Sequence, residues 1–540
     1  MTDGLGLGDA YGATLNRIKG QGGRKAGLGM ATLMWISHAE RPLKPDELRH
    51  ALAVEIGSPS FNSDNTPSIG TLLACCQGLV VVDREASTVR LIHFTLQEYL
   101  RAHTELFGTA HSTIAETCLS YLNSDQVKAL PSNPPRDLQR TPFLKYSSLY
   151  WGAHARKDLS DYAKRLALNL FGCSRHISTA ILLADLCFGF YSSGFDKRSW
   201  FSGLHFASMF GIVEIVTSLM GVENCDINER DWRGNTPLAW AARNGHEGVV
   251  EILLERADVD PNEPDKGGQT PLYRAASNGQ EGVVKILLGR DDVNPNKPDK
   301  WGQTPLFCAS GGGHEGVVDV LLGRADVDPN KPNKDGLTPL YYAAWDGHEG
   351  VVKILLERND VNPDKPNRYG QTPLWCAALS GHEGVVKILL DQNNVNPNKP
   401  NKWGRTPLYC AAENGQESVV KILLGRADVD PNEPDEDGLT PLCCAALNGH
   451  EGVVEILLGR GDVNPNKPDE DGQTPLCCAA SNGQEGVVKV LLERGDIDPD
   501  KPDKSGHTPL YCASESGQEG VVKILLGPDD AKPAKRRKLG

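Results

Sequence analysis

The tripeptide Thr-Pro-Leu occurs nine times in this chain of 540 residues, and consecutive copies are always 34 residues apart. A fixed period of this length predicts an array of stacked repeats rather than one compact domain. Each unit of such an array contacts mainly its neighbours, so the array offers one long surface and no enclosed pocket. Function therefore has to be sought on that surface. The repeated prolines are Pro237, Pro271, Pro305, Pro339, Pro373, Pro407, Pro441, Pro475 and Pro509.

The residues within one unit predict two helices and a turn-rich loop. Thr304 can cap a helix that has Pro305 at its first position, where the missing N–H costs nothing, and Gly313 can end that helix. An apolar stripe at helical spacing predicts the second helix. The Asp-, Asn-, Pro- and Gly-rich stretch that follows predicts a turn-rich finger. The stripe consists of Val317, Val318, Leu321 and Leu322.

A period of about 34 residues fits both tetratricopeptide and ankyrin repeats. The unit start Asp-x-x-Gly-x-Thr-Pro-Leu and the Gly-His before the second helix closely resemble the ankyrin family. The resemblance runs from about Ser202 to Gly527 and includes a degenerate first unit at Gly203, which makes ten units. It implies a mostly α fold, an ankyrin-repeat α-solenoid with β-hairpin fingers. The period exceeds the family norm by one residue, so we expect a longer finger at the Pro-Asn-Lys-Pro segment.

The first two hundred residues have a different pattern. Helices are predicted over Ala26–Glu40, from Pro45 onward and over Ile69–Leu79. Two short strands joined by a turn follow, and then a helix over Ile92–Leu100. Three helices and a hairpin in this order indicate a winged helix. The expected domains are a glycine-rich segment (1–25), a winged-helix-like domain (26–104), a helical connecting region (105–200), the repeats (201–528) and a basic tail (529–540).

Three segments resemble the winged-helix region that follows the NACHT module in fungal NLR-like (STAND) proteins. They are Met34-Trp-Ile-Ser-His-Ala-Glu-Arg-Pro-Leu, Glu47-Leu-Arg-His-Ala-Leu-Ala and His93-Phe-Thr-Leu-Gln-Glu-Tyr-Leu. Residues 105–200 resemble the helical arm of those proteins, most clearly at Tyr150-Trp-Gly-Ala-His-Ala-Arg. His93 lies near the nucleotide in some relatives, but here we interpret it as a structural residue of the helix junction.

A NACHT module needs G-x-x-x-x-G-K-[ST] to hold phosphates. This chain has only Gly20-Gln-Gly-Gly-Arg-Lys-Ala, which we interpret as a glycine-rich linker. ATP-driven switching is therefore not carried over from the resemblance, and no cofactor is expected. Whether an ATPase acts in trans stays open.

Charge is distributed unevenly along the chain, whose net charge is −14. Residues 1–200 contain 21 basic and 18 acidic residues (net +3), and the remainder contains 35 and 52 (net −17). An acidic array repels phosphate backbones, so we expect no nucleic acid on the repeats. The third helix of the winged helix has no Lys or Arg, which disfavours DNA readout. No secretory signal or membrane-spanning run is evident, so an intracellular protein, cytoplasmic and/or nuclear, without a membrane partner is expected.

No catalytic or metal-binding constellation stands out. Six of the 14 cysteines share one position, two residues after the leucine of Thr-Pro-Leu. The simpler interpretation is a small helix residue in a reducing compartment, and the alternative is a row of cysteines for metal binding or redox chemistry. Histidines recur at the Gly-His slot but alternate with glutamines, which favours a hydrogen-bonding role. Asp326-x-Asp328-x-Asn330 lacks the glycine and final acid of a calcium loop, so a finger turn is favoured. The six cysteines are Cys308, Cys376, Cys410, Cys444, Cys478 and Cys512.

Units differ from one another mainly at the finger tips and at the end of the first helix. The resemblance implies that these regions line the concave face that binds partners. Exposed aromatic residues flanked by cations are enriched at interface hot spots, whereas surface drift would not favour tryptophan. We expect a partner with an acidic or apolar patch on the middle repeats. The candidate residues are Trp232, Arg233, Lys300, Trp301, Trp345, Asp346, Arg368, Tyr369, Leu379, Lys402, Trp403 and Glu413.

The C-terminal end raises two further expectations. The cluster Lys535, Arg536, Arg537 and Lys538 resembles a nuclear import signal read by importin, and a solubilising tail is the alternative. The last unit keeps the apolar interior pattern, so we expect it either to fray or to associate end to end with another molecule. The sequence thus predicts a non-catalytic recognition protein, the sensor or scaffold part of an NLR-like protein. A nuclear scaffold or transcriptional cofactor is the alternative, and an enzyme would need a constellation in residues 1–200 that we do not find.

Overall fold

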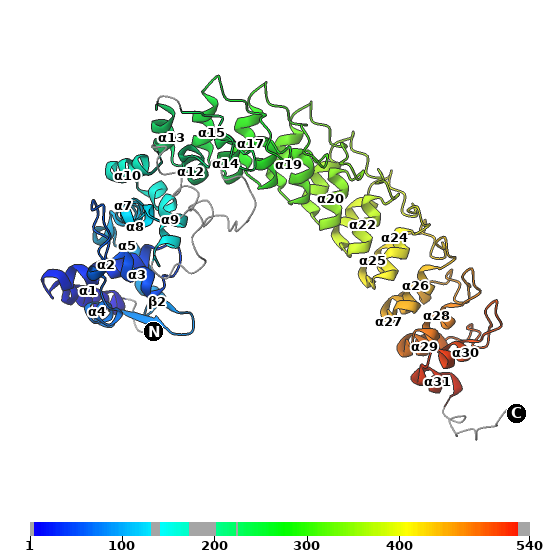
Figure 1. Cartoon of the computed structure of the whole chain (residues 1–540). Helices are drawn as coiled ribbons and strands as arrows, with labels where there is room; N and C mark the ends of the chain where they lie inside the picture. Colours follow the sequence, from blue (N-terminus) through cyan, green and yellow to red (C-terminus); the bar gives the residue numbers. More distant parts are fainter. Residues whose placement is uncertain (1–4, 131–140, 172–200, 223–224, 528–540) are drawn as a thin grey trace. The chain divides into compact units, whose positions relative to one another are not determined.

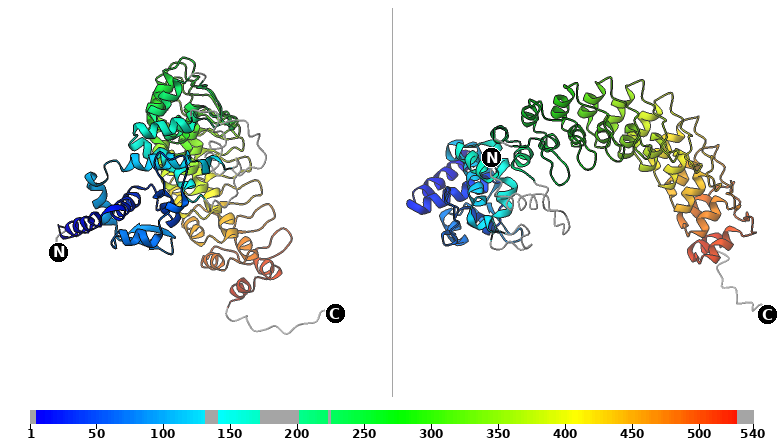
Figure 2. Two further views of the ribbon diagram at one scale, coloured as in Figure 1. Left: turned by 60° about the vertical axis from the view of Figure 1, so that its left-hand side comes forward. Right: turned by 45° about the horizontal axis from the view of Figure 1, so that its top comes forward.

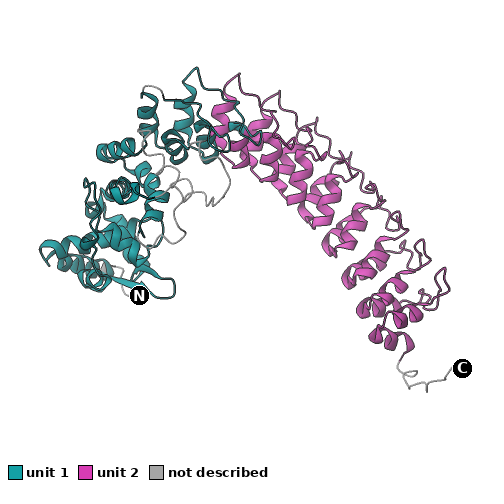
Figure 3. Cartoon of the chain, in the orientation of Figure 1, with its two compact units in different colours: residues 1–272 teal, residues 273–540 magenta. Residues whose placement is uncertain are grey.

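The computed structural model describes residues 5–130, 141–171, 201–222 and 225–527 (Figure 1). The chain divides into two compact units, Met1–Leu272 and Tyr273–Gly540 (Figure 3). Within the described residues the only sheet is a pair of strands, and the other regular elements are helices. The expected mostly α fold is therefore confirmed.

The N-terminal part contains the predicted winged-helix order. An antiparallel hairpin follows three helices, with Val80 opposite Leu91 and Asp83 opposite Thr88. The predicted helices and strands are confirmed with small shifts of their ends. The elements are α1 (Leu5–Lys19), α2 (Gly23–His38), α3 (Pro45–Ala51), η1 (Ser63–Asn65), α4 (Ile69–Cys75), β1 (Val80–Asp83), β2 (Thr88–Leu91) and α5 (Phe94–Ala102).

Helix α1 is a correction to the expected glycine-rich segment at residues 1–25. Leu15 and Ile18 are buried, and the hydroxyl of Tyr11 lies 2.9 Å from Oγ1 of Thr95 on α5. The glycines of this segment are tolerated in a helix because tertiary packing outweighs their weak helix propensity. Only the short turn at Gly20–Gly22 separates α1 from α2.

A helical region follows the hairpin. Helices α7 and α9 pack against each other over an aromatic core that includes Tyr121, Phe143, Tyr146 and Trp151. This packing places His111 on α7 beside His154 on α9. The helices are α6 (Thr104–Phe107), α7 (Ala110–Leu122), α8 (Asp125–Lys128), α9 (Leu144–Lys157) and α10 (Asp161–Phe171).

Helix pairs with the predicted period make up the remainder of the described chain (Figures 1 and 2). The first helices of the pairs are α12 (Gly203–Phe210), α14 (Pro237–Asn244), α16 (Pro271–Ser277), α18 (Pro305–Gly311), α20 (Pro339–Asp346), α22 (Pro373–Ser380), α24 (Pro407–Glu413), α26 (Pro441–Asn448), α28 (Pro475–Ser481) and α30 (Pro509–Glu515). The second helices are α13 (Val213–Met220), α15 (Glu247–Leu254), α17 (Glu281–Leu288), α19 (Glu315–Leu322), α21 (Glu349–Leu356), α23 (Glu383–Leu390), α25 (Glu417–Leu424), α27 (Glu451–Leu458), α29 (Glu485–Leu492) and α31 (Glu519–Leu526).

The local signals predicted for these helices are present. Oγ1 of Thr304 accepts the N–H of Phe307 at 3.2 Å, and Pro305 is the first residue of α18. Gly313, with φ of 70°, lies in the left-handed region that favours glycine. The apolar stripe of α19 is buried. Local capping and a buried helix face therefore fix each unit in the same way.

The fingers differ from the expected β-hairpins, because the described fingers contain tight turns and no strand pairing. In one finger the N–H of Asn333 donates to the carbonyl of Leu337 at 2.9 Å. Its side-chain oxygen accepts the N–H groups of Asp335 and Leu337, at 2.9 and 3.0 Å. Asn and Asp side chains thus accept hydrogen bonds from the backbone N–H groups that pairing of β-strands would need, and the prolines have no N–H to donate.

The cysteine slot has a packing role. Four of its members are buried, and the other two are half-buried. The slot cysteine contacts the residue two after the repeat proline in the preceding unit, for example Cys444 with Tyr409 and Cys478 with Cys443. These thiols fill small spaces between first helices, which agrees with the simpler reading of the slot.

Candidate functional site

The finger tips of Tyr273–Gly540 form a row along one side of the helix pairs (Figure 3). Neighbouring tips are joined through the backbone: the N–H of Lys334 donates to the carbonyl of Trp301, and that of Lys402 to the carbonyl of Tyr369, both at 2.9 Å. The first tip residue of one finger is thus bonded to the second tip residue of the finger before it. Because these bonds fix the backbone, the tip side chains are held at a regular spacing.

Three aromatic side chains of this row are exposed to solvent. Trp301 is 59% exposed, Trp403 47% and Tyr369 39%. The rings of Tyr369 and Trp403 stack with centroids 6.0 Å apart and planes 19° apart. We call Trp301, Tyr369 and Trp403 the aromatic tip row. Large apolar groups exposed together in this way are typical of a binding surface.

Cations accompany each of these aromatic residues. Lys300 and Lys402 are exposed beside Trp301 and Trp403. The Arg368 guanidinium lies 4.9 Å from the centroid of the Tyr369 ring. It also pairs with Asp335 of the preceding finger at 2.7 Å. The tips therefore present apolar rings with positive charge beside them, the combination expected from the sequence.

The second group of candidate residues lies at the ends of first helices. The Trp345 ring is 40% exposed and stacks on Tyr341 at 6.4 Å, and Asp346 is exposed. Leu379 is half-buried, and the carboxylate of Glu413 accepts a bond from Arg405 at 3.1 Å. Of these four, Trp345 and Asp346 are free to contact a partner, whereas Leu379 and Glu413 are partly used by packing and pairing.

Trp232 differs from the other candidate tryptophans. Its ring is half-buried and lies 5.8 Å from the ring of Phe201. Phe201 also packs edge-on against Trp240 at 5.4 Å. Trp232 therefore contributes to an aromatic cluster at the start of the repeats, and the expectation of a solvent-facing tryptophan there is wrong. Arg233 beside it is exposed.

The Gly-His slot has the predicted hydrogen-bonding role. Nε2 of His382 donates to the carbonyl of Trp345 at 2.9 Å, and Nε2 of Gln416 donates to that of Leu379 at 3.3 Å. Both bonds reach back 37 residues to the end of the preceding first helix. The same bond is made by His246 to Met209, His348 to Gly311, His450 to Glu413, Gln484 to Leu447 and Gln518 to Ser481.

The calcium-loop-like segment also has the predicted structural role. Oδ1 of Asp328 accepts the N–H of Asn330 at 2.9 Å, which closes a finger turn. The Asn330 side chain then donates to the carbonyl of Asp360 at 2.6 Å and accepts the N–H of Asn362 at 2.9 Å. The Pro-Asn-Lys-Pro segment, where the sequence predicts the longer finger, thus bonds to the neighbouring finger. Similarly, His93 caps α5, since its Nδ1 accepts the N–H of Thr95 at 3.3 Å.

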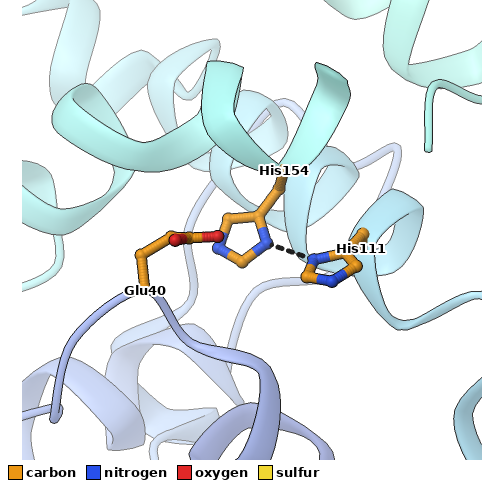
Figure 4. Close-up of side chains that lie close together, drawn as sticks. All are labelled: Glu40, His111 and His154. Atoms are coloured by element: carbon orange, nitrogen blue, oxygen red, sulfur yellow. Dashed lines mark hydrogen bonds between the residues drawn. The ribbon is translucent and has the colours of Figure 1, made fainter. Parts of the chain in front are cut away.

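A polar cluster that the sequence did not indicate lies in the N-terminal part (Figure 4). Glu40, His111 and His154 each present a potential ligand atom, and these atoms lie within 4.8 Å of one another. Nδ1 of His111 lies 2.8 Å from Nδ1 of His154, and Nε2 of His154 lies 2.9 Å from the hydroxyl of Tyr146. The Glu40 backbone amide donates to that hydroxyl at 3.1 Å.

Counting donors and acceptors assigns the protons in the row of hydrogen bonds from Tyr146 through His154 to His111. The Tyr146 oxygen already accepts from Glu40, so its O–H donates to Nε2 of His154. Nδ1 of His154 then carries the proton and donates to Nδ1 of His111. Burial, aided by the positive charge of neighbouring groups, lowers the pKa of His154 to about 3, which keeps its ring neutral. Burial also lowers the pKa of His111.

Of this cluster, Glu40 and His111 line a pocket of about 560 Å³ together with the cationic groups Arg101 and Lys157. Nζ of Lys157 donates to Oε1 of Glu40 at 2.6 Å, and Nε of Arg101 donates to the carbonyl of Ser37 at 2.8 Å. Lys157 thus occupies the carboxylate that a metal would need, and both ring nitrogens of His154 are already bonded. The arrangement is a hydrogen-bonded junction between α7 and α9 rather than a set of open ligands.

Comparison with known families agrees with the repeat geometry. The family model described as Ankyrin repeats (3 copies) matches residues 204–299, 291–367, 312–401, 359–435, 393–469, 427–503 and 461–536. These stretches cover more than half of the chain, which therefore belongs to the ankyrin-repeat family. A second model, described as GPI inositol-deacylase, winged helix domain, matches residues 16–112. The chain thus combines ankyrin repeats with an N-terminal winged-helix domain of the kind that follows NACHT.

No curated protein matches the chain. Among the helices in the described ranges, none combines the length and the apolar character needed to cross a bilayer. The basic cluster at Lys535–Lys538 lies outside the described residues.

Proposed function

We propose that this protein is a non-catalytic recognition protein that binds another protein through the finger tips and concave face of its ankyrin array. Ankyrin repeats generally mediate protein–protein interaction. The proposed organisation is a winged-helix domain and a helical connecting region that carry the array, as in the sensor or scaffold part of an NLR-like protein.

The observation that carries this proposal is the aromatic tip row. The units share a nearly constant frame, yet the tips at Trp301, Tyr369 and Trp403 present exposed rings with Lys or Arg beside them. Tryptophan and tyrosine provide large contact areas at low conformational cost, and Arg and Lys add charge complementarity. The partner surface that fits best is an acidic or apolar patch.

The experiment is affinity capture with the full chain and with the triple variant W301A/Y369A/W403A. We expect the triple variant to lose partners that the wild-type chain retains. Y511A is a matched control, because Tyr511 is also an exposed aromatic residue but lies on the first helix of the last unit. Unchanged partner binding by a triple variant that melts at the wild-type temperature would refute the proposal.

A further inference from the structure

Within Tyr273–Gly540 the charge of the tip row changes from positive to negative midway, and the last described finger, with Lys504, is again positive. Four consecutive fingers have a cation at the first tip position, and the next two fingers have acids at both tip positions. All eight of these residues are exposed, and the Lys334 finger has a half-exposed acid, Asp335, at its second tip position. Residues 201–540 have a net charge of −17, so the cationic half stands out against an acidic array. The cations are Lys300, Lys334, Arg368 and Lys402, and the acids are Glu436, Asp437, Glu470 and Asp471.

Both halves of the row have the same spacing. The N–H of Lys402 donates to the carbonyl of Tyr369 at 2.9 Å in the cationic half. The N–H of Glu470 donates to the carbonyl of Asp437 at 3.1 Å in the acidic half. Between the halves, the N–H of Glu436 donates to the carbonyl of Trp403 at 3.1 Å. A second copy of this chain therefore carries acidic groups at the same interval as the cations of the first.

We propose that the occupant of this tip surface is a second copy of the chain, bound antiparallel about a two-fold axis between the Lys402–Trp403 finger and the Glu436–Asp437 finger. This inference rests on the proposed function, since it requires that the tips be an interaction surface. In this arrangement the finger of Lys402 faces that of the partner's Glu436, and the finger of Arg368 faces that of the partner's Glu470.

The two-fold arrangement closes because each contact occurs twice. If the cationic half of one molecule instead bound the acidic half of the next head to tail, each pair would leave one cationic half and one acidic half unpaired. Further molecules would then add to these ends and form a filament. The stacked rings of Tyr369 and Trp403 lie on the two cationic fingers nearest the axis, so their exposed faces are covered on dimerisation. Exposed ion pairs contribute little individually, so the dimer is weak and sensitive to salt.

The test is the oligomeric state of the full chain, measured by sedimentation as a function of concentration. R368E/K402E makes the row near the axis acidic, and E436K/E470K makes it basic. We expect each variant alone to have a dimer dissociation constant at least about tenfold above that of the wild type. An equimolar mixture of the two should form a one-to-one heterodimer, because the opposite rows then face each other.

Two outcomes would overturn the inference: a wild-type chain that is monomeric throughout, or variants that dimerise as the wild type does. Equal melting temperatures show that the variants fold. The single substitutions K402E and E436K repeat the test without breaking an existing ion pair at Lys402, which makes none in the described residues. A monomeric wild type that still loses a protein partner in W301A/Y369A/W403A would refute the dimer alone. Dimerisation with partner binding unaffected by the aromatic substitutions would refute the recognition proposal instead.

Discussion

The hydroxyl of Tyr146 lies 2.9 Å from Nε2 of His154, and both side chains are buried on helix α9. The same hydroxyl accepts the backbone amide of Glu40, which belongs to the loop after α2. One oxygen atom thus satisfies two polar groups from segments more than a hundred residues apart in the chain.

The substitution Tyr146→Phe keeps the ring but removes this oxygen. We expect the free energy of unfolding to fall by about 1–3 kcal/mol, because two buried polar groups lose their partner. Urea unfolding of the full chain, followed by tyrosine and tryptophan fluorescence, measures the change. Tyr150→Phe is the control, since Tyr150 is only half-buried and its hydroxyl makes no hydrogen bond to a described residue. Equal stability of the two variants would show that the hydroxyl does not hold this junction.

Acid should destabilise the N-terminal part through His154. Burial lowers the pKa of His154 to about 3, whereas the unfolded chain has the ordinary value near 6.5. Between these two values the unfolded state binds a proton that the folded state does not, so stability is fully present above pH 6.5 and declines as the pH falls toward 3. At pH 5 the loss from this group is about 2 kcal/mol relative to pH 7.

Urea unfolding at pH 5 and pH 7 tests this loss, and His154→Gln should remove its share of the pH dependence. The His154 imidazole resonances should also show no titration between pH 8 and pH 5 in the folded protein. A His154 that titrates near pH 6.5 would contradict the neutral hydrogen-bonded chain.

The Gly-His slot predicts an asymmetric response to substitution. His382→Gln should be nearly neutral, because Gln416 makes the equivalent bond one unit later. His382→Ala should cost about 1 kcal/mol, since the carbonyl of Trp345 loses its donor. Thermal unfolding compares the two variants directly. If glutamine and alanine were equally destabilising at this position, the bond would have no measurable part in stacking.

Two glycines of the fingers should differ in their tolerance of alanine. Gly404 has φ of 75°, and a Cβ there would lie 3.0 Å from Cα of Asp435 in the next finger. We expect Gly404→Ala to destabilise the array by at least about 1 kcal/mol. Gly461 has ordinary φ and nothing within 4 Å of an added Cβ, so Gly461→Ala should be neutral or slightly stabilising. Chemical denaturation of both variants measures the contrast.

The basic tail gives a test of localisation. We expect a fluorescent fusion of the full chain to accumulate in the nucleus if importin reads Lys535, Arg536, Arg537 and Lys538, and replacing all four by alanine should abolish that accumulation. Replacing Lys501 and Lys504 of the last described finger is the control for a loss of positive charge nearby. An unchanged distribution after the alanine replacement would favour the solubilising role.

How far the sequence predicts this molecule depends on whether the signal is local. Thr304 and Pro305 predict the start of a helix because capping and the fixed φ of proline act within one turn. The exposed side chains of the aromatic tip row could be predicted because they vary within an otherwise constant frame. Neither argument needs knowledge of contacts far away in the chain.

The failures involve tertiary contacts instead. Helix α1 is rich in glycine and forms because Leu15 and Ile18 are buried. Trp232 occupies a tip position but packs on Phe201, which precedes the repeat frame. His111 and His154 have no motif between them, and only the packing of α7 on α9 brings them together.

The backward bond of the Gly-His slot has a consequence for how such genes change. Every described bond of this kind, from His382 or Gln416 for example, reaches only into the unit before it. An in-frame loss or gain of one 34-residue segment by recombination would therefore regenerate an equivalent joint on either side of the breakpoint. Recombination can therefore lengthen or shorten the array over generations while the contacts between units stay intact. What such events change is the order of the finger tips and of their charges.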